Sequence, residues 1–131
     1  MQDRPTALEL LEAVRAFVEE EIAPGLDPRQ RFHALVAANL LAIVRRELEH
    51  EGTQLQAEWQ RLARLVDRAD AASPAERGGL RAQVREWTAE LAERIRAGDA
   101  DGGERAREVR AHVRETVQEK LRVANPRLAR S

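Results

Sequence analysis

Apolar residues recur along this chain at intervals of three and four positions, a spacing that places them on one side of an α-helix. Five segments show the pattern, at residues 7–22, 28–51, 55–66, 80–95 and 109–121. No segment alternates with a period of two, and β-branched residues are thinly spread, so a sheet is not expected. The sequence therefore predicts an all-α fold, a single helical domain over residues 1–131 built as a bundle of about five helices.

Local signals mark the ends of the first two helices. Thr6 with Glu9 three positions later is typical of a capping box at a helix start. Pro24-Gly25 ends the first helix, and Asp27-Pro28 resembles an N-cap followed by a first-turn proline. Gly52 is a residue that can end the second helix. We therefore expect a turn at 23–27 and a break near 52.

Similar signals frame the two later helices. Ser73 with Glu76 forms a second capping-box pattern, and Gly98 is expected to be a C-cap. Asn125-Pro126 should end the last helix, because a residue before proline is disfavoured in helical conformation. Trp87 lies on the apolar stripe of the fourth helix, so we expect it to be buried.

The second helix differs from the others because it is apolar on two nearly opposite sides. One line consists of Phe32, Val36, Asn39 and Ile43, and the other of Ala37, Leu41, Val44 and Leu48. A helix that is apolar on both sides is buried on both sides. Either the other helices wrap around this central, doubly apolar helix, or one of its faces meets a second subunit. A homodimer is the simplest form of the second case.

Asn39 is the polar member of the first line. One interpretation is a buried structural amide that binds a neighbouring helix, since a buried amide needs hydrogen-bond partners. The other is a polar contact at the base of a ligand pocket. Arg46, Glu47 and His50 lie further along the same side, where the line turns from apolar to charged. That change marks either the mouth of a cleft or the point where the helix leaves the core.

Few residues suggest catalysis or metal binding. Glu47 and His50 form one Glu-x-x-His pair, but di-iron bundles need two such pairs, so no metal site is predicted. Lys120 falls on the apolar stripe of the last helix and is expected to extend its ammonium into water. His112 flanks that stripe, and we interpret it as a packed or surface histidine. With no catalytic constellation, we predict neither enzymatic activity nor a cofactor.

Composition excludes several partners. The net charge is -1 and only 3% of residues are aromatic, which argues against nucleic acid. Residues 1–76 hold 9 basic and 14 acidic groups, and residues 77–131 hold 13 and 9, an asymmetry that could steer two halves or two subunits together. The longest apolar run, Ala34–Val44, is too short to span a membrane. Without cysteine or a leader sequence, the chain is expected in the cytoplasm.

Several stretches resemble a family of small bacterial helical proteins described only as a domain of unknown function. They are Met1–Thr6, Phe32–Glu49, Leu91–Gly98 and Val123–Pro126. The resemblance implies a genomic setting beside acyl-CoA dehydrogenases and kinases similar to aminoglycoside phosphotransferases. It therefore implies an accessory role with one of these enzymes and supplies no catalytic residues.

Two functions follow as expectations. The first is a non-catalytic accessory or protein-interaction protein that self-associates and acts with such a dehydrogenase or kinase. The alternative is a helical bundle that binds a small molecule, such as an acyl or CoA-like ligand. Its binding residues would be Asn39, Arg46, Glu47 and His50. A sizeable pocket beside Asn39 would favour the alternative, and a filled core with an exposed apolar face would favour the first.

Overall fold

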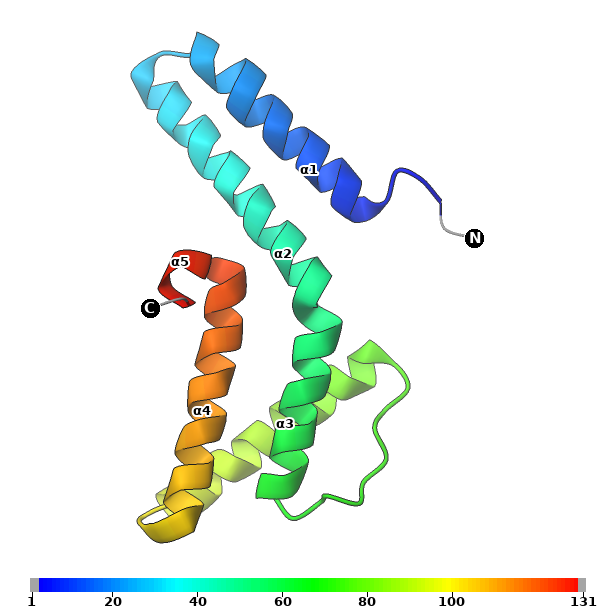
Figure 1. Ribbon diagram of the computed structural model, residues 1–131, viewed down its shortest axis with the longest axis vertical. Helices are drawn as coiled ribbons and strands as arrows, with labels where there is room; N and C mark the ends of the chain where they lie inside the picture. Colours follow the sequence, from blue (N-terminus) through cyan, green and yellow to red (C-terminus); the bar gives the residue numbers. More distant parts are fainter. Residues whose placement is uncertain (1–2, 130–131) are drawn as a thin grey trace. The chain divides into compact units, whose positions relative to one another are not determined.

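The computed structural model describes residues 3–129, which contain helices and turns and no strand, so the all-α prediction is confirmed (Figure 1). Met1 and Gln2, the first residues of the amino-terminal resembling stretch, lie outside the described residues. The α-helices are α1 (Ala7–Phe17), α2 (Pro28–Leu65), α3 (Arg77–Arg96), α4 (Gly103–Ala124) and α5 (Pro126–Ala129). A π-helical turn, Val18–Ile22, and a 3₁₀ turn, Ala23–Gly25, connect α1 to α2.

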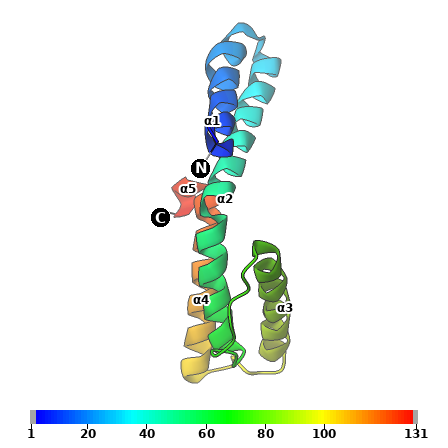
Figure 2. The ribbon, with the colours of Figure 1, turned by 90° about the vertical axis from the view of Figure 1, so that its right-hand side faces the viewer.

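The helices group into two compact units, one of residues 3–50 with 122–129 and the other of residues 51–121. In the first unit, α1 and the amino-terminal half of α2 lie side by side as an antiparallel hairpin (Figures 1 and 2). The second unit contains the carboxyl-terminal half of α2, all of α3 and most of α4. That residues 1–131 form a single domain stays a prediction.

The expected N-cap residues of α1 and α2 are confirmed. The Thr6 hydroxyl accepts a hydrogen bond from the Glu9 amide at 3.2 Å, and the Asp27 carboxylate accepts one from the Gln30 amide at 2.9 Å. The Arg31 guanidinium donates to the carbonyl of Leu26 at 3.1 Å and to two further carbonyls of the turn. The Thr6 and Asp27 bonds satisfy amides that the starts of α1 and α2 leave unpaired, and the Arg31 bonds hold the turn closed.

The expected end of the second helix at Gly52 is wrong, because α2 continues without a break to Leu65. A glycine inside a helix costs only about 1 kcal/mol relative to alanine, so the helical hydrogen bonds and packing on both sides override it. The helix ends instead at Leu65, and Asp67, two residues later, adopts a left-handed φ of 61°. The Arg68 amide then donates to the Ala63 carbonyl at 2.6 Å, as in a Schellman cap.

The ends of α3 follow the prediction only at the carboxyl terminus. Glu76 is the N-cap residue, and the Ser73 hydroxyl donates to the Gln56 side chain at 3.0 Å, so the predicted capping box is wrong. A contact with another helix thus took the place of the local cap. Gly98 ends the helix as predicted, directly after the C-cap residue Ala97: its φ is 95°, and its backbone N–H donates a hydrogen bond to the Ile95 carbonyl at 3.1 Å.

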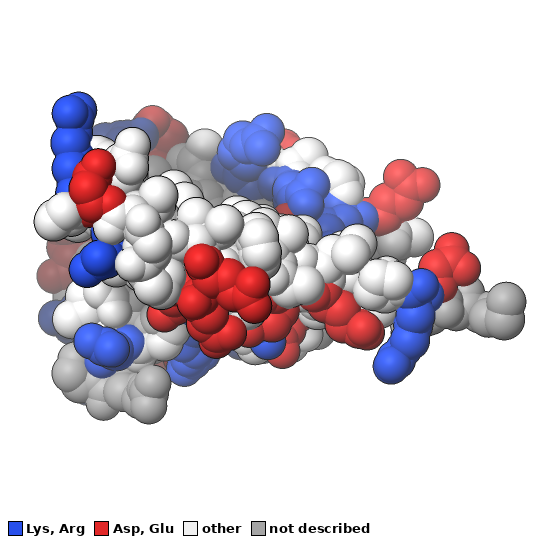
Figure 3. Space-filling model, turned by 90° about the horizontal axis from the view of Figure 1, so that it is seen from above, with Lys and Arg blue, Asp and Glu red and all other residues white. Residues whose placement is uncertain are grey.

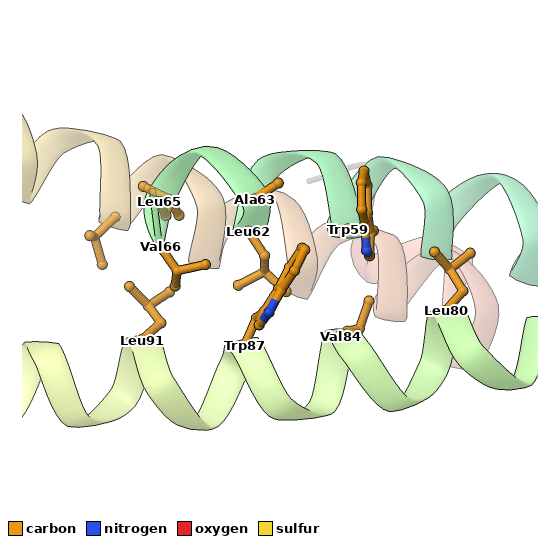
Figure 4. Close-up of a cluster of buried hydrophobic side chains, with 10 residues drawn as sticks. Trp59, Leu62, Ala63, Leu65, Val66, Leu80, Val84, Trp87 and Leu91 are labelled. Atoms are coloured by element: carbon orange, nitrogen blue, oxygen red, sulfur yellow. The ribbon is translucent and has the colours of Figure 1, made fainter. Parts of the chain in front are cut away.

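The core of the second unit lies between α2 and α3 and includes one residue of α4 (Figure 4). Trp87 is 4% exposed, which confirms its predicted burial. The buried cluster consists of Trp59, Leu62, Ala63, Leu65, Val66, Leu80, Val84, Trp87, Leu91 and Val109. Because α2 reaches Leu65 uninterrupted, it contributes four of these residues, and Val66 follows it directly.

The buried face of α4 differs from the predicted stripe. Val113 and Val117 are each 48% exposed, whereas Ala106, Val109, His112 and Glu119 are buried. The stripe prediction assumed that only apolar residues face the core. Arg61 of α2 instead pairs with polar residues of α4, and this rotates the valines outward. Lys120 is accordingly exposed.

Candidate functional site

The first unit buries almost none of its large apolar side chains. Eleven of the fourteen exposed large hydrophobic residues of residues 3–129 belong to this unit, and its buried apolar residues are Ala23 and Ala38. On the hairpin itself, the exposed residues are Leu10, Val14, Phe17, Ile22, Phe32, Leu35, Val36, Leu40, Val44 and Leu48. Clusters of exposed apolar residues of this size mark interaction sites in soluble proteins.

The strip of α2 that α1 covers is centred on alanines. Ala38 is buried, and Ala34 and Ala42 are partly buried one turn away on either side. Small side chains allow the two helices to approach closely and bury little apolar area. Both apolar lines predicted on α2 therefore remain largely uncovered within this unit, on either side of the alanine strip.

Asn39 is exposed, so the prediction of a buried structural amide is wrong. The prediction that Asn39 shares one side of the helix with Phe32 and Val36 agrees with the structure, because these two residues are also exposed, at 63% and 42%. The error lay in the assumption that an apolar line must be covered by the same chain. We consequently expect Asn39→Leu to change the free energy of unfolding by no more than about 0.5 kcal/mol.

A polar groove of about 480 Å³ runs between α1 and α2 beside Asn39. Arg15 donates to both carboxylate oxygens of Glu12, at 2.7 and 2.9 Å, and also pairs with Glu19. The hydrogen bond from Arg15 holds the pKa of Glu12 below its usual value. The Arg45 guanidinium lies 3.9 Å from the same carboxylate. The groove is thus lined by pairs of opposite charge.

A second groove of about 510 Å³ lies between α2 and the end of the chain. It is lined by Asn39, Arg46, Ala124, Asn125, Pro126 and Arg127. The Arg46 side chain donates to the Val123 carbonyl at 2.8 Å, which fastens the end of α4 to α2. Asn39 and Arg46 therefore both line each of the two grooves, as the predicted pocket requires.

Glu47 and His50, the other two predicted pocket residues, line neither groove and are exposed. The carboxylate beside the His50 imidazole is that of Glu49, at 4.0 Å. Among residues 3–129, no group of three or more histidine, aspartate or glutamate side chains is placed to hold a metal ion. The predicted site is thus assembled only in part, from Asn39 and Arg46.

The side of the hairpin opposite the first groove is apolar. Val14 is two positions from Glu12 on α1, and Val44 is two positions from Arg46 on α2. At about 100° per residue, each valine points roughly 160° away from its groove residue. Leu10 and Phe17 lie close to Val14, and Leu48 lies close to Val44 on the same wheel. We call Leu10, Val14, Phe17, Val44 and Leu48 the apolar face of the hairpin.

The second unit contains a buried polar cluster that sequence patterns did not indicate. Arg61 of α2 donates to Nδ1 of His112 at 3.2 Å, to Thr116 at 3.2 Å and to Glu119 at 2.6 Å. The Gln54 side chain donates to the Glu119 carbonyl at 3.0 Å. The spacing of 112, 116 and 119 on one helix face was the available signal, but only the fold shows that it meets an arginine.

This burial changes the titration of the cluster. Burial, with a contribution from the nearby Arg61 charge, lowers the pKa of His112 to about 4. His112 is therefore neutral near pH 7, and its Nδ1 accepts the hydrogen bond from Arg61. Burial also raises the pKa of Glu58, which lies near Lys120. The cluster thus joins α2 to α4 through one buried ion pair and a neutral imidazole.

A groove of about 310 Å³ adjoins this cluster. Its apolar wall comes from α3 and α4, and includes Leu91, Ile95, Val113 and Val117. Its polar residues are Glu58, Thr88, His112, Thr116 and Lys120. Apolar walls with a few polar groups are typical of sites for small amphipathic ligands.

Comparisons with known proteins identify a family without assigning an activity. None of the helices within residues 3–129 has the length and apolar content that crossing a membrane requires. The search found no matching curated protein and no matching solved structure. A family model described as a domain of unknown function (DUF6285) matches residues 24–128, which include α2, α3 and α4. The chain therefore belongs to the DUF6285 family.

Proposed function

We propose that this chain is a non-catalytic accessory protein that binds other proteins through its α1/α2 hairpin. The supporting observation is the exposure of the hairpin's large apolar side chains, including Phe17 at 52% and Phe32 at 63%. Exposed apolar area of this kind is stabilised when a partner removes it from water, at about 25 cal/mol per Å². Phenylalanine is also enriched at protein–protein interfaces relative to the rest of the surface.

The partner proposed for this role is an acyl-CoA dehydrogenase or a phosphotransferase-like kinase, acting with the chain in the cytoplasm. This part of the proposal comes from the family resemblance of the sequence. The binding element would be the Phe32 line, which we define as Phe32 and Val36 on α2. Both residues are exposed, so substituting them should not disturb the fold of the hairpin.

A pull-down from the organism that encodes the chain tests this proposal. The baits are the wild-type chain, Phe32→Ala/Val36→Ala, and the control Val113→Ala/Val117→Ala, which alters exposed valines of the second unit. We expect the wild type and the control to capture a dehydrogenase or kinase, and the Phe32 line variant to capture at least about tenfold less, the effect of 1.4 kcal/mol. Equal capture by all three, or capture of neither enzyme class by the wild type, would contradict the proposal.

A second candidate function is binding of an acyl-type small molecule, and the groove of the second unit favours it. Its apolar wall would hold an alkyl chain, and the exposed Lys120 ammonium would pair with a carboxylate or phosphate. This moves the expected ligand site from Asn39 to the α3/α4 groove. Isothermal titration with a medium-chain fatty acid tests it: Lys120→Met should weaken binding severalfold, whereas no heat with the wild type would exclude this ligand class.

A further inference from the structure

We infer that the apolar face of the hairpin binds the same face of a second copy, forming a twofold four-helix bundle in which α1 of each copy lies over α2 of the other. The inference rests on the proposed role of the hairpin as a binding element. It assigns one binding partner to the apolar face, a second copy of the chain, in one orientation. Two kinds of observation support it, the register of the apolar residues and the unequal charge of the two helices.

The register makes the apolar face complementary to itself. Glu12 and Arg45 approach to 3.9 Å, so residues of α1 and α2 whose numbers add to about 57 lie at one level of the hairpin. A twofold axis parallel to the helices keeps each level and exchanges the helices. It therefore places Val14 of one copy over Val44 of the other, Leu10 over Leu48, and Phe17 over Leu41. Every large residue of the face meets another apolar residue.

The available area is sufficient for a stable pair. The five residues of the apolar face are between 42% and 52% exposed. At roughly 100 Å² each, they present on the order of 500 Å² of apolar area, which matches the apolar share, about 57%, of the roughly 800 Å² that each partner buries in a standard interface. Because the Phe32 line points to a different side of α2, the pairing leaves Phe32 accessible.

Charge decides which helices face each other. Residues 1–27 hold seven acidic and two basic side chains, a net charge of −5, whereas residues 28–46 hold four arginines and no acidic residue, a net charge of +4. Seen from above the view of Figure 1, a group of acidic side chains and a group of basic ones are separated by uncharged surface in the middle of the view, and opposite charges adjoin at its two ends (Figure 3). Pairing α1 with α1 would bring two acidic helices together, whereas pairing α1 with α2 places opposite charges side by side.

Size-exclusion chromatography coupled to light scattering tests whether a second copy binds the apolar face. The 14.8 kDa chain should elute as a dimer at micromolar concentration. Val14→Asp should produce a monomer with unchanged helical circular dichroism, because Val14 is half-exposed in a single copy. The matched control Phe32→Asp places the same charge on α2, on a side of the hairpin that the pairing leaves accessible. This variant should remain dimeric. A monomeric wild type at high micromolar concentration, or a dimeric Val14→Asp, would overturn the inference.

Disulfide mapping tests the helix order, and the absence of native cysteine makes it specific. Val14→Cys and Val44→Cys are prepared separately, then oxidised alone and after mixing. We expect the interchain disulfide only in the mixture. A disulfide in Val14→Cys alone would mean that α1 faces α1 of the second copy, because Val14 lies near the middle of the segment formed by α1 and the turn that follows it. This result would overturn the proposed order of the helices.

The two proposals fail in different ways. A monomeric wild type whose enzyme partner is lost in Phe32→Ala/Val36→Ala would refute the second copy and leave the accessory role intact. A dimer that maps as expected but captures neither enzyme class would refute the accessory role and confirm the pairing.

Discussion

The indole rings of Trp59 and Trp87 pack against each other between α2 and α3, with centroids 5.3 Å apart and planes inclined by 34°. Trp59 also donates its ring N–H to the Gln83 side chain at 2.6 Å, and the Arg68 guanidinium lies 5.8 Å from the Trp87 ring centre. An aromatic pair of this geometry contributes about 0.5–1.5 kcal/mol beyond its buried area. Both rings belong to the buried cluster of the second unit.

Trp87→Ala should lower the free energy of unfolding by roughly 3–5 kcal/mol, because it removes a buried ring and leaves a cavity beside Trp59. Urea unfolding followed by circular dichroism measures the loss. Val113→Ala, at an exposed position of α4, is the control and should change stability by less than about 0.5 kcal/mol. An unchanged midpoint for Trp87→Ala would mean that the two rings do not form this core.

His112 should make the protein less stable in mild acid. Its pKa is about 4 in the folded chain, against about 6.5 for an exposed histidine. The unfolded chain therefore binds a proton between these values that the folded chain does not. This contribution is fully present above about pH 6.5 and falls by up to about 3 kcal/mol as the pH drops to 4.

The His112→Gln variant isolates this effect, because glutamine can still accept the hydrogen bond from Arg61 but does not titrate. Carboxylates with lowered pKa values, such as Asp67 and Glu90, also stabilise the folded protein less as the pH falls through an overlapping range. They are present in both proteins, so their contribution cancels in the comparison. We expect the wild type to lose more stability than the variant between pH 7.5 and 4.5. If the stability of the wild type and of the variant changed in parallel with pH, His112 would bind protons equally in the folded and the unfolded chain, and the prediction would be wrong.

The Arg61–Glu119 pair should show strong coupling. Their side chains are 18% and 9% exposed, so Arg61→Met leaves a carboxylate buried without a partner and should cost about 3–5 kcal/mol. Adding Glu119→Met removes that stranded charge and should restore part of the loss. A double-mutant cycle by urea unfolding measures the coupling. Additive effects of the two substitutions would mean that the pair contributes no specific interaction.

Gly52→Ala and Gly98→Ala should act in opposite directions. Gly52 lies inside α2, so alanine should raise stability by about 0.5–1 kcal/mol. The added methyl would lie 2.8 Å from the end of the Arg77 side chain, which is flexible enough to move. Gly98 has a φ of 95°, which alanine adopts only with strain of about 1–3 kcal/mol. Destabilisation by Gly52→Ala would indicate that the helix ends there after all.

The sequence by itself determined the features whose physics is local. The caps at Thr6 and Asp27 and the left-handed Gly98 involve residues within a few positions of one another, so their hydrogen bonds form whatever the distant chain does. The all-α class and the burial of Trp87 follow from a stripe that is long and strongly periodic.

The tertiary structure decided the features that depend on which surfaces meet. Gly52 stays helical because packing outweighs a weak local preference, and α4 buries His112 rather than Val113 because Arg61 of a distant segment pairs with it. Asn39 is exposed because, within residues 3–129, no segment covers most of its apolar line. Periodicity shows that a helix face is apolar, but what covers that face depends on contacts between segments far apart in the sequence or between separate chains.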